Sequence, residues 1–253
     1  MPWRPRRRVP LPFQSEARLP SNRYNCSLAG VFISFEGIDG SGKTTQLHRL
    51  SEMLTGQGHE VIVAREPGGT RVGNEIRRLL LDAASTDLRP VPELLLYFAS
   101  RAQNIAEVIG PALAAGKIVL VDRFTDATVA YQGCGRDLGV ETVRAVEQVA
   151  CRGLKPDLTL FLDIDPAVAL PRARARNAVQ AQDESRMERQ SLSFYEKVRQ
   201  AYLDLCRQEP QRVRLVSGSG DADEVAARVI AVAEAFLASR FPGPYSQKAP
   251  TGT

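Results

Sequence analysis

Histidine and cysteine are both scarce in this chain of 253 residues. His48 and His59 are its only histidines, which excludes most histidine-based catalytic sites and every multi-histidine metal centre. The four cysteines stand far apart and form no C-x-x-C pair, so neither a zinc site nor a disulfide framework is indicated. We expect reduced thiols, as is usual in the cytosol.

Apolar runs long enough to cross a membrane are also missing from the sequence. The N-terminus lacks the apolar core that a signal peptide needs. We therefore expect a soluble, cytoplasmic protein with no membrane partner.

Acidic residues are almost absent from residues 1–30, which hold six arginines and one glutamate, a net charge of +5. The whole chain carries +4, with a sequence pI near 9.0, so the remainder is close to neutral at −1. Five prolines among these arginines oppose helix and strand alike. We predict a disordered Arg/Pro-rich extension at 1–30, one domain at 31–239 and a disordered tail at 240–253. Because the basic charge lies in the extension, we expect no nucleic-acid partner.

The stretch Gly37 to Thr44 fits the phosphate-loop pattern G-x-x-x-x-G-K-[ST] at every position. An apolar, β-branched run at 31–35 leads in, and a helical pattern at 46–54 leads out, as this motif requires. Glycines let backbone N–H groups turn around an anion at a helix N-terminus, where the helix dipole also favours negative charge. Lys43 then reaches the β- and γ-phosphates, and the Thr44 hydroxyl ligates Mg²⁺. The predicted nucleotide-binding residues are Gly37, Ile38, Asp39, Gly40, Ser41, Gly42, Lys43, Thr44 and Thr45.

Four further apolar runs, at 61–64, 118–121, 158–163 and 213–216, are typical of buried strands. They alternate with helical patterns at 75–81, 91–115, from Pro166 onward, at 187–207 and at 221–239. This order predicts an α/β fold, with a P-loop NTPase-type parallel five-stranded sheet, helices on both faces and a lid segment.

Three charged residues follow the predicted strands at the sheet edge where ligands bind in such folds. Arg65 follows the second strand, in a place suited to hold a phosphate, although a solvated loop arginine would look the same. Asp122 and Arg123 end the third strand. Asp122 is placed to hold Mg²⁺ directly or through water, and Arg123 to bridge the charge between two phosphates.

Two polar pairs recur at helical spacing. Tyr97 and Arg101 share one helix face, where a ring can stack on a base beside a guanidinium, although from the residues alone core packing is the simpler explanation of Tyr97. Thr128 and Gln132, also four residues apart, suit the polar edge of a base. The polar segment 177–186 is either a closing lid or a solvated run of charges.

Together these residues resemble the thymidylate kinase family from Val31 to about Leu237. The resemblance rests on several motifs in the right order: the phosphate loop with Asp39 inside it, R-E-P-G-G-T at 65–70, Y-F-A-S-R at 97–101, D-R-F at 122–124 and A-Y-Q-G at 130–133. It implies transfer of the γ-phosphoryl group of ATP to dTMP with Mg²⁺, a step of dTTP biosynthesis, in a homodimer.

The same resemblance implies roles for individual residues. Arg65 and Arg101 hold the acceptor nucleotide, Tyr97 stacks on thymine in place of the usual phenylalanine, and Thr128 and Gln132 contact the edge of the base. Asp39 helps to position the acceptor, while Lys43 and Arg123 neutralise charge. Because the phosphate loop has Asp39 and Ser41 where other members carry a basic residue, a lid at about 174–187 supplies the missing arginine. Arg186 is the first choice, and Arg174 and Arg176 are the others.

Two other classes of protein share parts of this pattern. A GTPase-type switch would have the phosphate loop, but the guanine-specifying N-K-x-D segment does not occur in the sequence. A kinase for a different small molecule is the stronger alternative, and a test of several nucleotides distinguishes it.

Overall fold

A computed structural model describes residues 30–177 and 184–240 of the chain. Nearly all of the predicted N-terminal extension and of the predicted tail, and the middle of the predicted lid, lie outside the described residues. In the part that is described, no helix has the length and apolar character needed to cross a bilayer.

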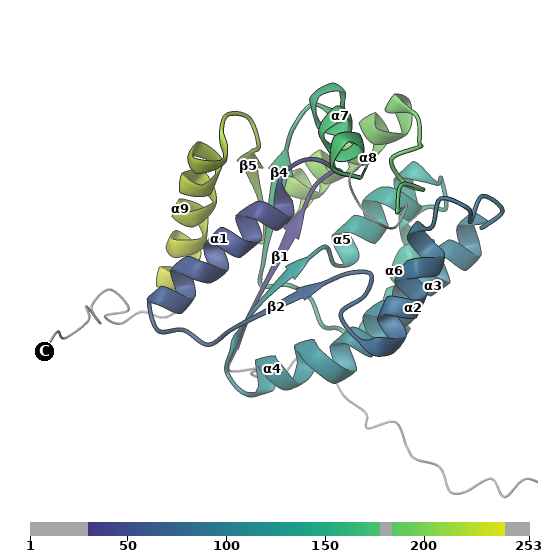
Figure 1. Cartoon of the computed structure of the whole chain (residues 1–253). Coiled ribbons are helices and arrows are strands. Elements are labelled where there is room, and N and C mark those ends of the chain that lie inside the picture. Colours follow the sequence, from purple (N-terminus) through teal and green to yellow (C-terminus); the bar gives the residue numbers. More distant parts are fainter. Residues whose placement is uncertain (1–29, 178–183, 241–253) are drawn as a thin grey trace, which may run out of the picture.

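The core of the fold is a five-stranded sheet in the order β2-β3-β1-β4-β5, in which all neighbouring strands are parallel (Figure 1). This confirms the predicted fold class. The strands are β1 (Val31–Glu36), β2 (Val61–Arg65), β3 (Ile118–Asp122), β4 (Leu158–Asp163) and β5 (Val213–Ser217).

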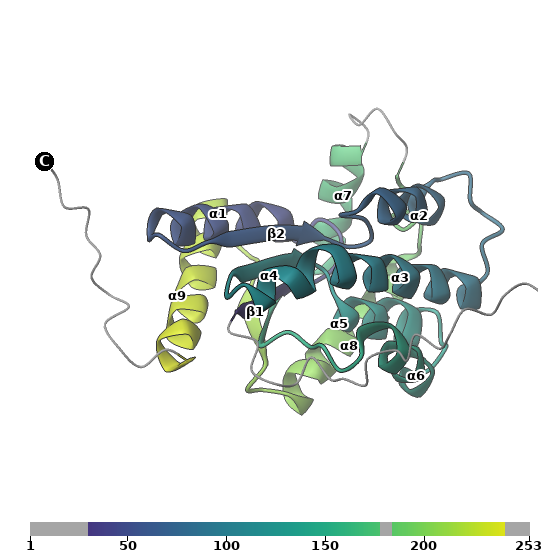
Figure 2. The same ribbon diagram turned by 90° about the horizontal axis from the view of Figure 1, so that it is seen from below.

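Helices cover both faces of the sheet (Figures 1 and 2). Alternate residues of β1 point to opposite faces: Ile33 packs with α1 and α9, and Phe32 packs with α3, α6 and α8 on the other face. The helices are α1 (Lys43–Gly56), α2 (Arg71–Leu81), α3 (Pro90–Asn104), α4 (Gly110–Ala114), α5 (Thr125–Thr128), α6 (Val140–Cys151), α7 (Pro166–Asn177), α8 (Leu192–Gln208) and α9 (Ala222–Arg240), with π-helical turns η1 (Ile105–Ile109) and η2 (Val129–Gly135).

The register of the strands aligns the residues that follow them. Asp122 of β3 pairs with Phe35 of β1 on one side and with Arg65 of β2 on the other. The phosphate loop, the loop after Arg65 and the turn after Asp122 therefore leave the sheet at one edge, as the sequence predicted.

Candidate active site

The phosphate loop connects β1 to α1. Gly40 and Gly42 have φ values of 81° and 90°, in the left-handed region that favours glycine. A Cβ atom at position 40 would lie 2.0 Å from the carbonyl oxygen of Ala169, so the loop packs closely against α7. Lys43, the first residue of α1, is buried and donates from Nζ to the carbonyl of Ile38 at 2.8 Å. Its amine is thus held across the loop, where an anion would bind.

Burial lowers the pKa of Lys43, and the neighbouring charge of Arg123 lowers it further, to about 8. Burial and a neighbouring cation thus disfavour the charged form of this amine. A bound phosphate would supply the missing negative charge and favour the charged form.

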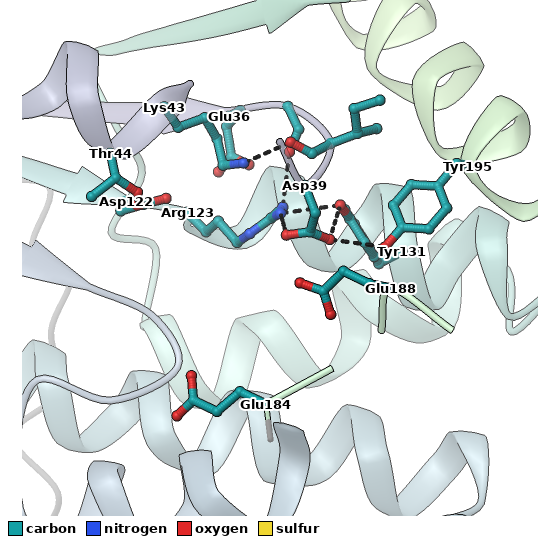
Figure 3. A network of polar contacts seen from close by, with 12 residues as sticks. Glu36, Asp39, Lys43, Thr44, Asp122, Arg123, Tyr131, Glu184, Glu188 and Tyr195 are labelled. Atoms are coloured by element: carbon teal, nitrogen blue, oxygen red, sulfur yellow. Dashed lines mark hydrogen bonds and ion pairs between the residues drawn. The ribbon is translucent and has the colours of Figure 1, made fainter. Parts of the chain in front are cut away.

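Thr44 and Asp122 form a pair suited to hold a divalent cation. The Thr44 hydroxyl donates to Asp122 Oδ2 at 2.5 Å (Figure 3). Within residues 30–177 and 184–240, no three His, Cys, Asp or Glu side chains gather as a metal centre. One hydroxyl and one carboxylate beside a phosphate loop fit Mg²⁺, which in such sites takes its other ligands from phosphates and water.

Asp39, inside the loop, is the centre of a polar cluster (Figure 3). It accepts from Arg123 at 2.7 Å, from Tyr131 at 3.1 Å and from Tyr195 at 3.0 Å. Burial raises the pKa of Asp39, but the charges of Arg123 and Lys43 and these hydrogen bonds outweigh burial and hold it well below its usual range. Asp39 is therefore a fixed anion that also orients Arg123.

Arg123 occupies the junction between the loop and β3. Its φ of 71° is unusual for a residue with a Cβ atom, and its backbone N–H donates to the carbonyl of Phe35 at 3.0 Å. The guanidinium donates to the carbonyl of Gly37 at 3.0 Å and lies over the ring of Tyr131, 4.7 Å from its centroid. A rigid cation is thus presented beside the phosphate loop.

A cavity of about 730 Å³ extends from the loop toward α3 and η2. Its volume is typical of a small-molecule site. The predicted site residues that line it are Asp39, Gly40, Gly42, Lys43, Thr44, Thr45, Arg65, Tyr97, Arg101, Asp122, Arg123, Thr128 and Gln132. Gly37, Ile38 and Ser41 form the buried side of the loop and are not among the lining residues.

Arg101 is more deeply buried, and makes more hydrogen bonds within the protein, than the sequence suggested. Only 1% of its surface is exposed, and it donates to Glu66 at 2.5 Å, to Thr128 Oγ1 at 2.9 Å and to the carbonyl of Phe124 at 3.0 Å. These bonds use three of the five N–H groups of a guanidinium. Arg101 therefore fixes the cavity wall and still has donors to offer a ligand.

The three predicted lid arginines lie in different places. Arg176, at the end of α7, is exposed and lines the cavity, and Arg174 donates to the carbonyl of Glu188 at 3.4 and 3.3 Å. Arg186 does not line the cavity. It is buried, with Nη1 on Glu93 at 2.7 Å and Nε on the carbonyl of Leu80. In this conformation Arg186 is a structural residue, and a direct role in catalysis would require it to leave Glu93.

Two glutamates that the sequence did not single out also line the cavity (Figure 3). Glu184 binds Arg77, with distances of 3.1 and 2.6 Å. Glu188 is buried, its Oε2 has no hydrogen-bond partner within the described residues, and burial together with the charge of Asp39 raises its pKa. A polar group of a bound ligand would satisfy it.

Glu66 and Tyr195 are further site residues that the sequence reasoning missed. Glu66 lies inside R-E-P-G-G-T, so its charge beside Arg65 was a usable signal. Tyr195 has no local signal, because it reaches Asp39 from α8, 156 residues along the chain.

Comparisons with known proteins point to a single family. The sequence model of the thymidylate kinase family matches residues 35–229. The chain is 50% identical over 203 residues to a thymidylate kinase of Pelobacter propionicus, covering 80% of this chain and 93% of that protein. It is 52% identical over 199 residues to a thymidylate kinase of Syntrophotalea carbinolica, covering 78% of this chain and 92% of that protein. A crystal structure of thymidylate kinase from Ehrlichia chaffeensis is similar in fold, with a TM-score of 0.65 and 32% sequence identity. The match covers 81% of this chain and 98% of that one.

Proposed function

Because the chain belongs to the thymidylate kinase family, it is a nucleoside monophosphate kinase that phosphorylates dTMP, and we propose that ATP bound with Mg²⁺ on the phosphate loop is the phosphoryl donor. The reaction yields dTDP and ADP, and dTDP leads to dTTP. The bond between the γ-phosphorus and the bridging oxygen to the β-phosphate breaks, and a bond from a phosphate oxygen of dTMP forms.

The continuity of the cavity is the observation that supports this proposal most strongly. Lys43 and Thr44 of the phosphate loop line the same cavity as Tyr97, Thr128 and Gln132. A donor on the loop and an acceptor between α3 and η2 would share one cavity, which transfer between two nucleotides requires.

Catalysis by this site is alignment and charge neutralisation. Thr44 and Asp122 would hold Mg²⁺, which would supply positive charge against the phosphates of the donor. Lys43 places a cation at the donor phosphates, and Arg123 places another between donor and acceptor. The acceptor oxygen of dTMP is already anionic, so a general base is not needed.

The acceptor nucleotide would be held by the residues around α3 and η2. We propose that Arg65 and Arg101 bind its phosphate and base, that Tyr97 stacks on thymine, and that Asp39 positions the sugar and phosphate. Burial raises the pKa of Tyr97 to about 12, so its ring stays neutral during turnover.

We further propose that the enzyme is a homodimer acting in the cytoplasm. Val91 and Leu95, one turn apart on α3, are about half exposed, at 53% and 51%. Leu79 on α2 and Val149 on α6, the helices that pack beside α3, are exposed at 50% and 78%. A second copy of the chain would cover these apolar side chains.

An ADP-release assay with ATP, Mg²⁺ and a panel of monophosphates tests the function. We expect dTMP to be strongly preferred over AMP, dCMP and GMP, and Lys43→Ala to abolish turnover. Equal rates with AMP would overturn the assignment, and turnover with Mg²⁺ removed by a chelator would overturn the role of the metal.

A further inference from the structure

Glu93 is a buried carboxylate that the mechanism above does not use. It lies in the first turn of α3, only 1% exposed. It is not among the residues that line the cavity, whereas its partner Gln132 is. Glu93 therefore lies behind Gln132, as seen from the cavity.

Three side chains from two other segments surround this carboxylate. Its Oε1 accepts from Gln132 Nε2 at 2.8 Å and from Arg136 Nε at 3.2 Å. Its Oε2 accepts from Arg136 Nη2 at 3.2 Å and from Arg186 Nη1 at 2.7 Å. Two guanidinium groups thus fix both oxygens, so the carboxylate has no freedom to rotate away from Gln132.

Glu93 is ionised in this setting. Burial raises its pKa, but the hydrogen bond from Gln132 and the charges of Arg136 and Arg186 outweigh burial and bring the pKa below its ordinary value. An ionised carboxylate only accepts hydrogen bonds. Gln132 must therefore turn its NH₂ group toward Glu93, which settles the choice between the two orientations of its amide.

The fixed amide has a consequence for the ligand. With its NH₂ group bound to Glu93, Gln132 has its amide oxygen left to offer to the cavity. Thymine and uracil carry a hydrogen on N3 and donate there, whereas N3 of cytosine has a lone pair and accepts. An acceptor in the wall matches the first two bases and repels the third.

We propose that Glu93 is a positioning residue for base selection: it holds the Gln132 amide with its oxygen toward the base, so that monophosphates with an N3–H group are selected over dCMP. This inference rests on the proposed function, because it requires the base to lie against Gln132. It assigns no role to the thymine methyl group, so dUMP should respond to changes at Glu93 as dTMP does.

The Glu93→Gln variant tests the proposal because it should reverse the Gln132 amide. Two guanidinium groups donate to the Oε2 position, at 3.2 and 2.7 Å, and of the guanidinium nitrogens only Arg136 Nε donates to the Oε1 position, so the oxygen of the new amide is favoured at Oε2 and its NH₂ group faces Gln132. Gln132 then turns its own oxygen inward and its NH₂ group to the cavity. We expect kcat/KM to fall for dTMP and dUMP by a similar factor and to rise for dCMP, so that the dTMP/dCMP ratio falls by about ten- to a hundredfold.

A matched control is Asp163→Asn, which removes a carboxylate held by Arg199 at 2.6 and 2.9 Å outside the cavity wall. We expect this variant to lose stability and to keep the wild-type ratio. Gln132→Met, similar in size but without an amide, should lower the ratio by itself. In the Gln132→Met background, adding Glu93→Gln should change the ratio by less than about twofold.

The possible outcomes separate the two hypotheses. If the wild-type enzyme does not phosphorylate dTMP, the proposed function fails and this inference fails with it. If the wild-type enzyme does phosphorylate dTMP, two results would overturn the inference alone. One is a folded Glu93→Gln variant with the wild-type dTMP/dCMP ratio. The other is a Glu93→Gln change that lowers this ratio by the same factor whether residue 132 is Gln or Met. Should Glu93→Gln not fold, an unchanged ratio in Gln132→Met would still overturn the inference, because it requires the amide oxygen to make the selection.

Discussion

Glu36 is a single buried residue whose ionisation makes the stability of this fold depend on pH. It ends β1 with no exposed surface, accepts from the backbone N–H of Phe124 at 2.6 Å and accepts from the Tyr202 hydroxyl at 2.8 Å. Burial and the charge of Asp126 raise its pKa from 4.5 to about 8, against the opposing effects of Arg123 and these hydrogen bonds. Glu36 is therefore protonated in the folded protein at neutral pH.

This predicts a stability that falls as the pH rises. Since the folded pKa lies above the unfolded one, the contribution of Glu36 is complete below 4.5 and is lost as the pH increases to about 8. Glu36→Gln removes this titration. Between pH 5 and 8, the free energy of unfolding of the variant should therefore rise relative to that of the wild type by a few kcal/mol in total, on the order of 1.4 kcal/mol per pH unit. Urea denaturation across this range measures the gain. If the free energies of unfolding of the two proteins changed with pH in the same way, this prediction would be contradicted.

The lid arginines form the second residue-scale prediction. Arg176 lines the cavity, so we expect Arg176→Ala to lower kcat by on the order of a hundredfold and to change KM for dTMP little. Arg186→Ala should mainly destabilise the protein, because it removes a donor from buried Glu93, whereas Arg101→Ala should raise KM. Steady-state kinetics and melting curves on these variants and Arg174→Ala separate the roles. If all three lid variants keep the wild-type kcat, the lid does not supply catalytic charge.

At the scale of elements, the start of α2 determines the shape of the loop at 66–69. Thr70 caps this helix by accepting from Gly73 N–H at 2.9 Å. A Cβ atom on Gly73 would lie 2.8 Å from the carbonyl oxygen of Gly68 and 2.8 Å from Thr70 Oγ1. The loop and the helix therefore pack as one unit, and that unit borders the cavity.

Gly73→Ala should move this loop. We expect a lower melting temperature and a raised KM for dTMP, because Glu66 belongs to the displaced loop and Arg65 directly precedes it. The control is Gly56→Ala at the end of α1, where an added Cβ meets no atom within 4 Å. The control should be neutral or stabilising by up to about 1 kcal/mol. An unchanged KM in Gly73→Ala would show that the loop accommodates the methyl group.

Elements with a strong apolar pattern were predictable from the sequence, and the others were not. All five strands lie where apolar runs occur. Helix α2 begins at Arg71, four residues before the predicted start, and α8 at Leu192, five after it, because Thr70 and Ser191 act as caps. The sequence reasoning missed α6, which begins after Gly139 without a side-chain cap. The predicted helix 91–115 contains the π-helical turn η1, which the apolar spacing did not indicate.

At the scale of the molecule, residues inside motifs were predictable and their distant partners were not. Lys43, Asp122 and Gln132 belong to motifs whose chemistry is local. Glu93 of α3 meets Gln132, and Glu188, just before α8, lines the same cavity as Lys43 and Asp122, because the fold brings together segments that are far apart in the sequence. No short window of sequence contains such pairings.

The exposed side chains of α2, α3 and α6 allow a test of assembly. If this surface joins two copies, a charge placed at its centre should separate them, because each copy would then bury an unpaired carboxylate. We expect the wild-type protein to show about twice the chain mass of 27.7 kDa in light scattering, and Leu95→Glu to show the mass of one chain. Leu215→Glu is the control: it places the same charge at a side chain that is 48% exposed on the edge strand β5, away from α3. Because Tyr97 and Arg101 are on the same helix as Leu95, loss of the partner should also raise KM for dTMP. A wild-type protein of single-chain mass, or a Leu95→Glu protein that keeps the double mass, would contradict this arrangement.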